Sequence, residues 1–297
     1  MLRVLTLLIL VVVEVSTVWA QPVPAEIKST VGFIFVPNKE NIPVPNGTCF
    51  FVGVKIPQTE MAFLYTITAK HVLEENPATH AFFKQIYIRV NTKDGQSRML
   101  ALDLSHDGPQ QNVFLHNDPT VDLAVIRVHL DDEKDDFKFL PSDLILTKDD
   151  VSALKVTEGS EVFFTGLFTS HVGQRRNNPI VRFGRVALMT DEKIMWDRGQ
   201  MVELYLVESA SYGGNSGSPV FLFLGPERTP GRFMIGNRLI KLAGVMMGSF
   251  GELAPVRFIE TAIKPFGHQS MGIAAVVPAY KLNEILFSDE VKARRGF

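Results

Sequence analysis

Three short motifs contain the residue types that nucleophilic catalysis requires. They hold a histidine (His71), an aspartate (Asp122) and a serine (Ser216), in that order along the chain. A serine hydroxyl is a weak nucleophile at neutral pH, so it needs a neighbouring base to take its proton. An imidazole can be that base when a carboxylate holds its ring in the correct tautomer. The three residues therefore predict acyl transfer through an activated serine, provided that folding brings them together.

The serine motif also contains the glycines that an oxyanion site needs. It reads Gly213-Gly214-Asn215-Ser216-Gly217-Ser218-Pro219. Glycine permits backbone torsions that a Cβ atom forbids, so several N–H groups can point toward one spot. We expect the N–H groups of Gly214 and Ser216 to hold the charge that develops on an attacked carbonyl. Each motif alone is a weak signal, because the chain has seven histidines and most Gly/Ser turns are plain loops. The signal is their combination.

The elements that must position these residues are predicted to be β-strands. The apolar segments are short, rich in Val, Ile, Phe and Thr, and separated by Gly, Pro, Asn and Asp. Many short strands at such spacing indicate a sandwich or a barrel. Asp94-Gly95 between two alternating segments predicts a hairpin, and sustained helical periodicity is found mainly from Pro278 to about Phe287. We expect strands at 31–36, 49–56, 63–68, 85–90, 98–102, 123–128, 161–166, 180–189, 202–207, 218–224, 238–247 and 271–277.

The strands fall into two β units with an acidic segment between them. The units cover about 27–130 and 150–285, and the linker of about 131–150 carries eight acidic residues. We interpret the linker as a solvated connector, because its spacing does not match a helix-loop-helix calcium loop. The histidine and aspartate motifs lie in the first unit and the serine motif in the second, which predicts a site in the crevice between them.

The order and the amino-acid sequences of the motifs resemble those of trypsin/chymotrypsin-like serine peptidases. Within that group the chain is most similar to the bacterial HtrA/DegP-like branch, and the similarity extends over about 30–285. The histidine motif reads Thr68-Ala69-Lys70-His71-Val72, and the aspartate motif reads Val121-Asp122-Leu123-Ala124-Val125. The serine motif reads Gly214-Asn215-Ser216-Gly217-Ser218-Pro219-Val220. The last two core strands also resemble that branch, and they read Leu242-Ala243-Gly244-Val245 and Met271-Gly272-Ile273-Ala274-Ala275-Val276-Val277-Pro278. Ser218 stands where a second glycine is commoner.

The resemblance implies a fold, a site and a substrate class. The fold is all-β, with two six-stranded antiparallel β-barrels and a short C-terminal helix. Ser216 would attack the carbonyl of a polypeptide substrate, His71 would act as the base, and Asp122 would orient the imidazole. By the same analogy, Ala210 would lie at the base of the specificity pocket and Met246, with Met247, would line its wall, although strand alternation favours a core position for at least one of the two methionines. No acidic residue stands at that base, which disfavours a preference for Arg or Lys.

The sequence also departs from relatives of this kind. Asn215 stands where digestive trypsins have an aspartate that pairs with a newly cut N-terminal ammonium, and no Ile-Val-Gly-Gly start is present. We therefore expect activity without such processing. The sequence ends at Phe297, soon after Pro278, so we expect none of the PDZ domains that HtrA-like proteins often carry. The segment 248–270, with Pro255 and Pro265, is predicted to form a loop near the pocket.

The first 20 residues have the order of a secretory signal peptide. Arg3 precedes the ten-residue apolar run of Val4–Val13, and Val18-Trp19-Ala20 forms a small-x-small cleavage site. Because spanning a bilayer takes about 20 apolar residues, we favour a cleaved signal over a retained anchor. The mature peptidase domain would be 21–297, exported to the periplasm or the cell exterior and with no stable membrane span.

Composition excludes several other classes of protein. The chain has 297 residues, with Lys+Arg 30 against Asp+Glu 32 and 46% hydrophobic residues. A net charge of −2 argues against a nucleic-acid binder, which needs a basic excess. The single cysteine, Cys49, excludes an intramolecular disulfide and a Cys-rich zinc site, and we expect it to be buried. No metal-ligand spacing such as His-Glu-x-x-His occurs, so we expect no metal and no cofactor.

The sequence leaves two other interpretations open. One is a protease-like module that binds polypeptides as a chaperone would, without catalysis. The other is an α/β-hydrolase using Ser216, Glu252 or Glu260, and His268. The second is disfavoured because its nucleophile elbow needs Gly-x-Ser-x-Gly, whereas this chain reads Gly-Asn-Ser-Gly-Ser.

Overall fold

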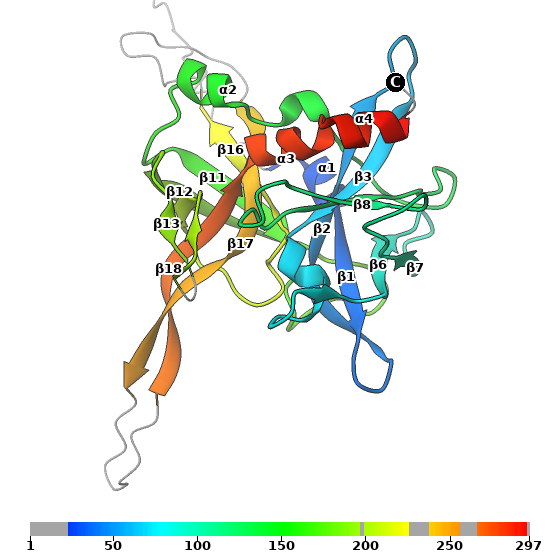
Figure 1. The fold of residues 1–297 in the computed structure, drawn as a ribbon, viewed down its shortest axis with the longest axis horizontal. Helices are drawn as coiled ribbons and strands as arrows, with labels where there is room; N and C mark the ends of the chain where they lie inside the picture. The colour runs from blue at the N-terminus through cyan, green and yellow to red at the C-terminus, as the bar shows by residue number, and fades with distance from the viewer. Residues whose placement is uncertain (1–22, 197–198, 226–237, 256–265, 296–297) are drawn as a thin grey trace, which may run out of the picture.

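The fold was obtained as a computed structural model, which describes residues 23–196, 199–225, 238–255 and 266–295 (Figure 1). The signal segment proposed for residues 1–20 lies outside this range. The first half of the chain forms a sheet with the strand order β7-β6-β1-β2-β3-β9-β8, to which β10 adds by pairing with β2. These strands are β1 (Val31–Pro37), β2 (Pro43–Lys55), β3 (Ala62–Thr68), β6 (Gln85–Asn91), β7 (Ser97–Asp103), β8 (Val113–Leu115), β9 (Ala124–Arg127) and β10 (Leu140–Pro141).

The second half forms a closed barrel with the strand order β11-β12-β15-β18-β17-β16. Its strands are β11 (Glu161–Gly166), β12 (Ile180–Met189), β15 (Tyr205–Glu208), β16 (Pro219–Leu224), β17 (Leu239–Pro255) and β18 (Phe266–Pro278). Two small pairs, β4 (Glu74–Asn76) with β5 (Ala81–Phe82) and β13 (Ile194–Met195) with β14 (Met201–Val202), lie outside the main sheets. The helical elements are α1 (Ala25–Ser29), η1 (Lys70–Leu73), η2 (Ser142–Leu144), α2 (Lys148–Ala153), α3 (Ala279–Leu286) and α4 (Asp289–Arg295).

The predicted all-β class is confirmed, with a closed six-stranded barrel in the second half and short C-terminal helices. The first half is a half-barrel rather than a closed one, because its end strands β7 and β8 do not pair. Asn112, next to the short strand β8, spans the gap instead. Its amide donates to the carbonyl of Asp103 at 2.6 Å and accepts the N–H of Ser105 at 3.0 Å.

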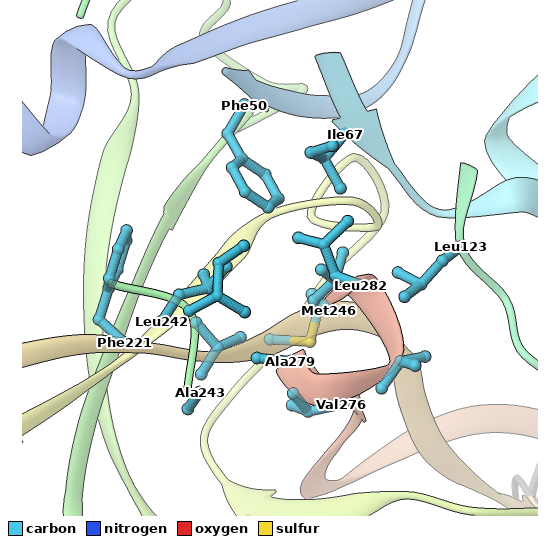
Figure 2. Packing of buried hydrophobic residues seen from close by; sticks show 14 of the residues in the cluster. Phe50, Ile67, Leu123, Phe221, Leu242, Ala243, Met246, Val276, Ala279 and Leu282 are labelled. Carbon is cyan, nitrogen blue, oxygen red and sulfur yellow. The ribbon is translucent and has the colours of Figure 1, made fainter. Parts of the chain in front are cut away.

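The two halves share one hydrophobic core. The same cluster of buried side chains contains Phe50 and Ile67 of the first sheet, Phe221 and Met246 of the barrel, and Leu282 of α3 (Figure 2). Burying a side chain of this size contributes about 1.5–3 kcal/mol, so the cluster holds the halves in a fixed relation. That relation matters because the predicted site draws residues from both.

Two sequence predictions about connecting segments were wrong. The segment 248–270 is not a loop over its described part: β17 and β18 continue as a paired ribbon out to Pro255 and Phe266, which projects from the barrel in Figure 1. The acidic linker is not wholly solvated either. Asp135 is 2% exposed because Arg98 neutralises it, with nitrogen–oxygen distances of 2.6 and 2.7 Å.

Candidate active site

His71 and Asp122 come together because two antiparallel strands lie side by side. The end of β3 pairs with the start of β9, with Thr68 opposite Ala124. His71 lies in the 3-10 turn that follows β3, and Asp122 lies just ahead of β9. Both residues therefore emerge at the same edge of the first sheet, 51 residues apart in sequence.

The carboxylate of Asp122 holds His71 by both of its oxygens. Oδ1 accepts the backbone N–H of His71 at 2.9 Å, and Oδ2 lies 2.6 Å from the ring Nδ1. The side chain of Asp122 is 7% exposed and that of His71 is 44% exposed. Because an ionised carboxylate is only an acceptor, Nδ1 carries the proton. Nε2 is then left as the acceptor on the ring.

The contact shifts the pKa of both groups in favour of the charged pair. Loss of hydration lowers the pKa of His71, but the charge of Asp122 and its hydrogen bond outweigh this effect and leave the pKa raised. Burial raises the pKa of Asp122, yet the attraction and hydrogen bonds of His71 leave that pKa lowered. Asp122 is therefore ionised at neutral pH, and His71 is more basic than a free imidazole.

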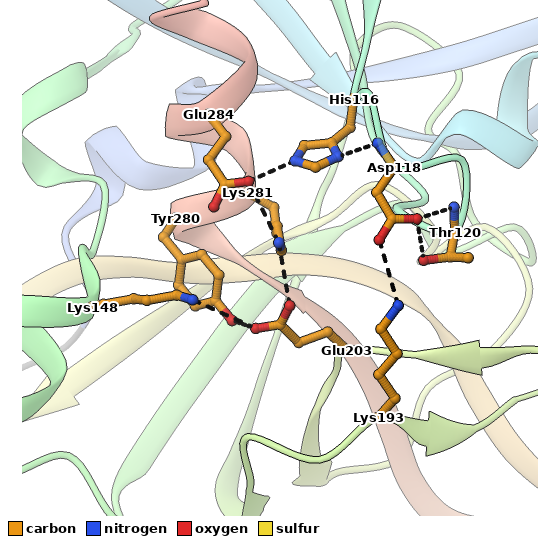
Figure 3. Close-up of polar contacts among 9 residues, drawn as sticks. All are labelled: His116, Asp118, Thr120, Lys148, Lys193, Glu203, Tyr280, Lys281 and Glu284. Carbon is orange, nitrogen blue, oxygen red and sulfur yellow. Dashed lines mark hydrogen bonds and ion pairs between the residues drawn. The ribbon is translucent and has the colours of Figure 1, made fainter.

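The loop ahead of Asp122 is braced by a polar network that reaches α3 (Figure 3). His116 accepts the N–H of Asp118 at 2.9 Å through Nδ1, and its Nε2 lies 2.7 Å from Glu284. Asp118 in turn accepts both the N–H and the hydroxyl of Thr120, and Lys193 lies 3.6 Å from its carboxylate. The network fixes the loop that delivers Asp122.

The serine turn has a regular pattern of paired and unpaired N–H groups. The N–H of Asn215 donates to Tyr212, that of Gly217 to Met246, and that of Ser218 to Asn215, at 2.8–3.0 Å. Among the described residues, the N–H groups of Gly214 and Ser216 donate to no partner. These two N–H groups are the ones that the sequence predicted for an oxyanion site. Gly214 has a φ of +92°, a torsion that favours glycine.

Asn215 locks this turn with its side chain. The residue is 1% exposed, its amide nitrogen donates to the carbonyl of Leu167 at 2.7 Å, and its amide oxygen accepts the N–H of Tyr212 at 3.0 Å. Both functions of the amide are thus satisfied without an ionic partner. An aspartate could accept the N–H of Tyr212 but could not donate to Leu167.

Ser216 is hydrogen-bonded to Met247, a residue that lines the same cleft as His71. Its hydroxyl donates to the carbonyl of Met247 at 3.2 Å. Met247 also lines a cleft of about 740 Å³ together with His71, Asp122, Glu74 and Trp196. Of the three residues singled out by the sequence, His71 and Asp122 line this cleft, whereas the hydroxyl of Ser216 is bonded to Met247 on its wall rather than to His71.

The proposed pocket residues lie in different surroundings. The carbonyl of Ala210 accepts a hydrogen bond from the guanidinium of Arg182 at 3.0 Å, and its place at the pocket base stays a prediction. Met246 is 0% exposed and belongs to the shared core, so its side chain does not face a substrate. This corrects its assignment to the pocket wall; Met247 lines the cleft beside His71, and its place in the specificity pocket stays a prediction. Cys49 is fully buried, and burial raises the pKa of its thiol.

The chain also matches a known protein family. Residues 47–225, which include all three motifs, match the trypsin-like peptidase domain. The chain belongs to this family. No curated protein matches the sequence.

Two solved structures to which the chain is similar are distant in sequence. The apo MamO protease domain of Magnetospirillum magneticum is similar with 17% identity and a TM-score of 0.50, over 88% of this chain and 97% of that one. Deg5 matches with 14% identity and a TM-score of 0.43, over 75% of this chain and 80% of that one. At these identities the likeness to the MamO domain supports the fold alone.

Within the part of the chain that the structure describes, no three His, Cys, Asp or Glu side chains lie close enough to share a metal ion. None of the described helices has the length and apolar character needed to cross a lipid bilayer.

Proposed function

We propose that the chain is an exported serine endopeptidase that hydrolyses peptide bonds through His71, Asp122 and Ser216. Membership of the trypsin-like peptidase family supports a polypeptide substrate. The observation that carries the proposal is the hold of Asp122 on His71, with 2.6 Å between carboxylate and ring nitrogen. It leaves Nε2 unprotonated, which is the state that a general base requires.

The proposed reaction begins when the hydroxyl of Ser216 turns from the carbonyl of Met247 toward Nε2 of His71. The oxygen of Ser216 attacks the substrate carbonyl while its proton passes to Nε2, and Asp122 stabilises the imidazolium. The oxyanion is held by the N–H groups of Gly214 and Ser216, which have no other partner among the described residues. The imidazolium gives its proton to the leaving amine, and water then hydrolyses the acyl-enzyme by the same route.

The surroundings of the site support two finer points of the proposal. The satisfied amide of Asn215 supports activity without an ion pair to a new N-terminus. The positive charge of Arg182 beside Ala210, with no carboxylate at residue 210, disfavours Arg and Lys in the substrate and favours uncharged side chains.

The periplasmic or extracellular location rests on the signal sequence of residues 1–20.

A fluorophosphonate probe tests the nucleophile. We expect the probe to label Ser216 in the wild type and not in Ser216→Ala, with mass mapping of the labelled peptide. Ser218→Ala is the matched control, because the hydroxyl of Ser218 is buried and has no hydrogen-bond partner within the described part of the chain. This control should label as the wild type does. A wild type that binds polypeptide but neither labels nor hydrolyses it would instead support the non-catalytic binding module.

A further inference from the structure

One threonine of the first sheet is bonded to the serine turn of the barrel. Thr48 lies in β2 and is completely buried. Its N–H donates to the carbonyl of Ser216 at 2.9 Å. Its hydroxyl donates to the carbonyl of Gly214 at 2.7 Å and accepts the N–H of Leu167 at 2.9 Å. The hydroxyl of Thr68 completes the set by donating to the carbonyl of Thr48 at 2.8 Å. Every polar group of Thr48 is therefore paired.

The bonds of Thr48 are made to the two residues whose N–H groups are proposed to hold the oxyanion. Gly214 and Ser216 each give their carbonyl to Thr48, and each keeps a free N–H among the described residues. A planar peptide leaves two soft torsions per residue, so holding these carbonyls limits how the turn can rotate. The turn needs such support because Gly214 and Gly217, with φ of +92° and +84°, add little stiffness of their own.

We propose that Thr48 is a positioning residue for the oxyanion site, an inference that rests on the proposed peptidase function. The hydroxyl of Thr48 fixes the carbonyl of Gly214 and, through Leu167, the segment that Asn215 also holds. The N–H groups of Gly214 and Ser216 are then aimed before substrate arrives. Donors that need no reorganisation in the transition state are a main source of catalysis in acyl transfer.

Replacement of the hydroxyl by a methyl group separates this role from packing. Thr48→Val keeps the shape of the side chain but removes one donor and one acceptor, so the carbonyl of Gly214 and the N–H of Leu167 lose their partner. The turn then rotates to find other partners. We expect kcat to fall about 10- to 100-fold, less than the 100- to 1,000-fold for losing an oxyanion donor outright, while KM changes less than about threefold.

Two variants accompany this one. Thr48→Ser restores the hydroxyl and should recover kcat to within about threefold of the wild type. Thr66→Val is the matched control in neighbouring β3, because Thr66 is equally buried and its hydroxyl has no hydrogen-bond partner among the residues that the structure describes. It should keep the wild-type kcat. If Thr48→Val does not fold, Thr48→Ala below its melting temperature takes its place.

The measurements are steady-state hydrolysis of an unfolded polypeptide, the rate of fluorophosphonate labelling, and amide hydrogen exchange at Leu167. Faster exchange at Leu167 with reduced kcat in Thr48→Val, absent from Thr66→Val, supports the inference. Wild-type kcat in Thr48→Val, or an equal loss in Thr66→Val, overturns the positioning role while the peptidase stands. An inert wild type removes the proposed function and this role with it.

Discussion

At the scale of single residues, one carboxylate sets both the direction of the His71 ring and the position of its proton. Asp122 raises the pKa of His71 above the ordinary value of an imidazole. Catalysis needs neutral His71, so kcat/KM should fall as the pH drops through that raised pKa. The acid limb of the pH profile should accordingly lie above about 6.5.

The variant Asp122→Asn tests this relation. Loss of the charge lowers the pKa of His71 and moves the acid limb to lower pH. The amide would also favour the tautomer with the proton on Nε2, so kcat should drop about 10⁴-fold. Asp118→Asn on the same loop is the control, since Asp118 contacts Thr120 and Lys193 rather than His71. An unmoved acid limb in Asp122→Asn would remove Asp122 from the proposed mechanism.

At the scale of elements, the serine turn fits between two strands of the other half with no room for a methyl group. A Cβ on Gly217 would lie 2.1 Å from the carbonyl oxygen of Thr48 and 2.4 Å from the hydroxyl of Thr68. Gly217 also has a φ of +84°, where other residues are strained. The backbone of the serine turn therefore packs directly against β2 and β3.

Gly217→Ala should therefore destabilise the fold and displace the turn together. We expect a loss of about 1–3 kcal/mol from strain, measured by urea unfolding, together with much slower labelling of Ser216. Gly213→Ala is the control for stability, because a Cβ there meets nothing within 4 Å. It should stay within about 0.5 kcal/mol of the wild type. Equal stability of the two variants would contradict the tight fit seen at Gly217.

The local pattern of the sequence was enough for most strands but not for the contacts between distant elements. Strands β1, β3, β11 and β12 were predicted almost to the residue, because their Val, Ile and Phe runs end at turns. Helix α2 was missed although its signal is present: Thr147 and Asp150 form a capping box. The ribbon of β17 and β18 was missed because Pro255 and Pro265 favour a loop, although the two consecutive strands pair with each other as far as Pro255 opposite Phe266.

The residues of the site also differ in how far the sequence could predict them. The residue types at 71, 122 and 216 carried their own chemical signal, and Asp122 was found against His71 as predicted. Thr48 gave only a weak signal, a hydroxyl within an apolar strand. Its bond to Gly214 spans 166 positions of sequence, and only the docking of the two halves creates it. Met246 was misassigned for a related reason, because strand alternation does not say which methionine faces the core.

At the scale of the whole molecule, the C-terminal helices hold the two halves together. Helix α3 packs against β17 and β18 of the barrel and against β9 of the first sheet, and Figure 1 shows α3 and α4 running across both. Glu203 adds ionic contacts to this junction, with Lys281 at 3.2 Å and Lys148 at 3.9 Å. Since His71 and Ser216 belong to different halves, stability at this junction bears directly on the site.

Arg295 at the end of α4 is the most buried of these junction cations. Its Nε donates to the hydroxyl of Tyr65 in β3 at 2.8 Å, and its guanidinium lies 5.2 Å from the centre of that ring. It also donates to the carbonyl of Leu286. Arg295→Ala leaves these partners unpaired in the interior, so we expect a loss of about 2–3 kcal/mol. The adjacent Arg294 is partly exposed and bonds only to loop groups at residues 108–111, so Arg294→Ala should cost less than about 1 kcal/mol. Urea unfolding of the two variants measures the difference, and equal losses would show that α4 does not hold the first sheet through Arg295.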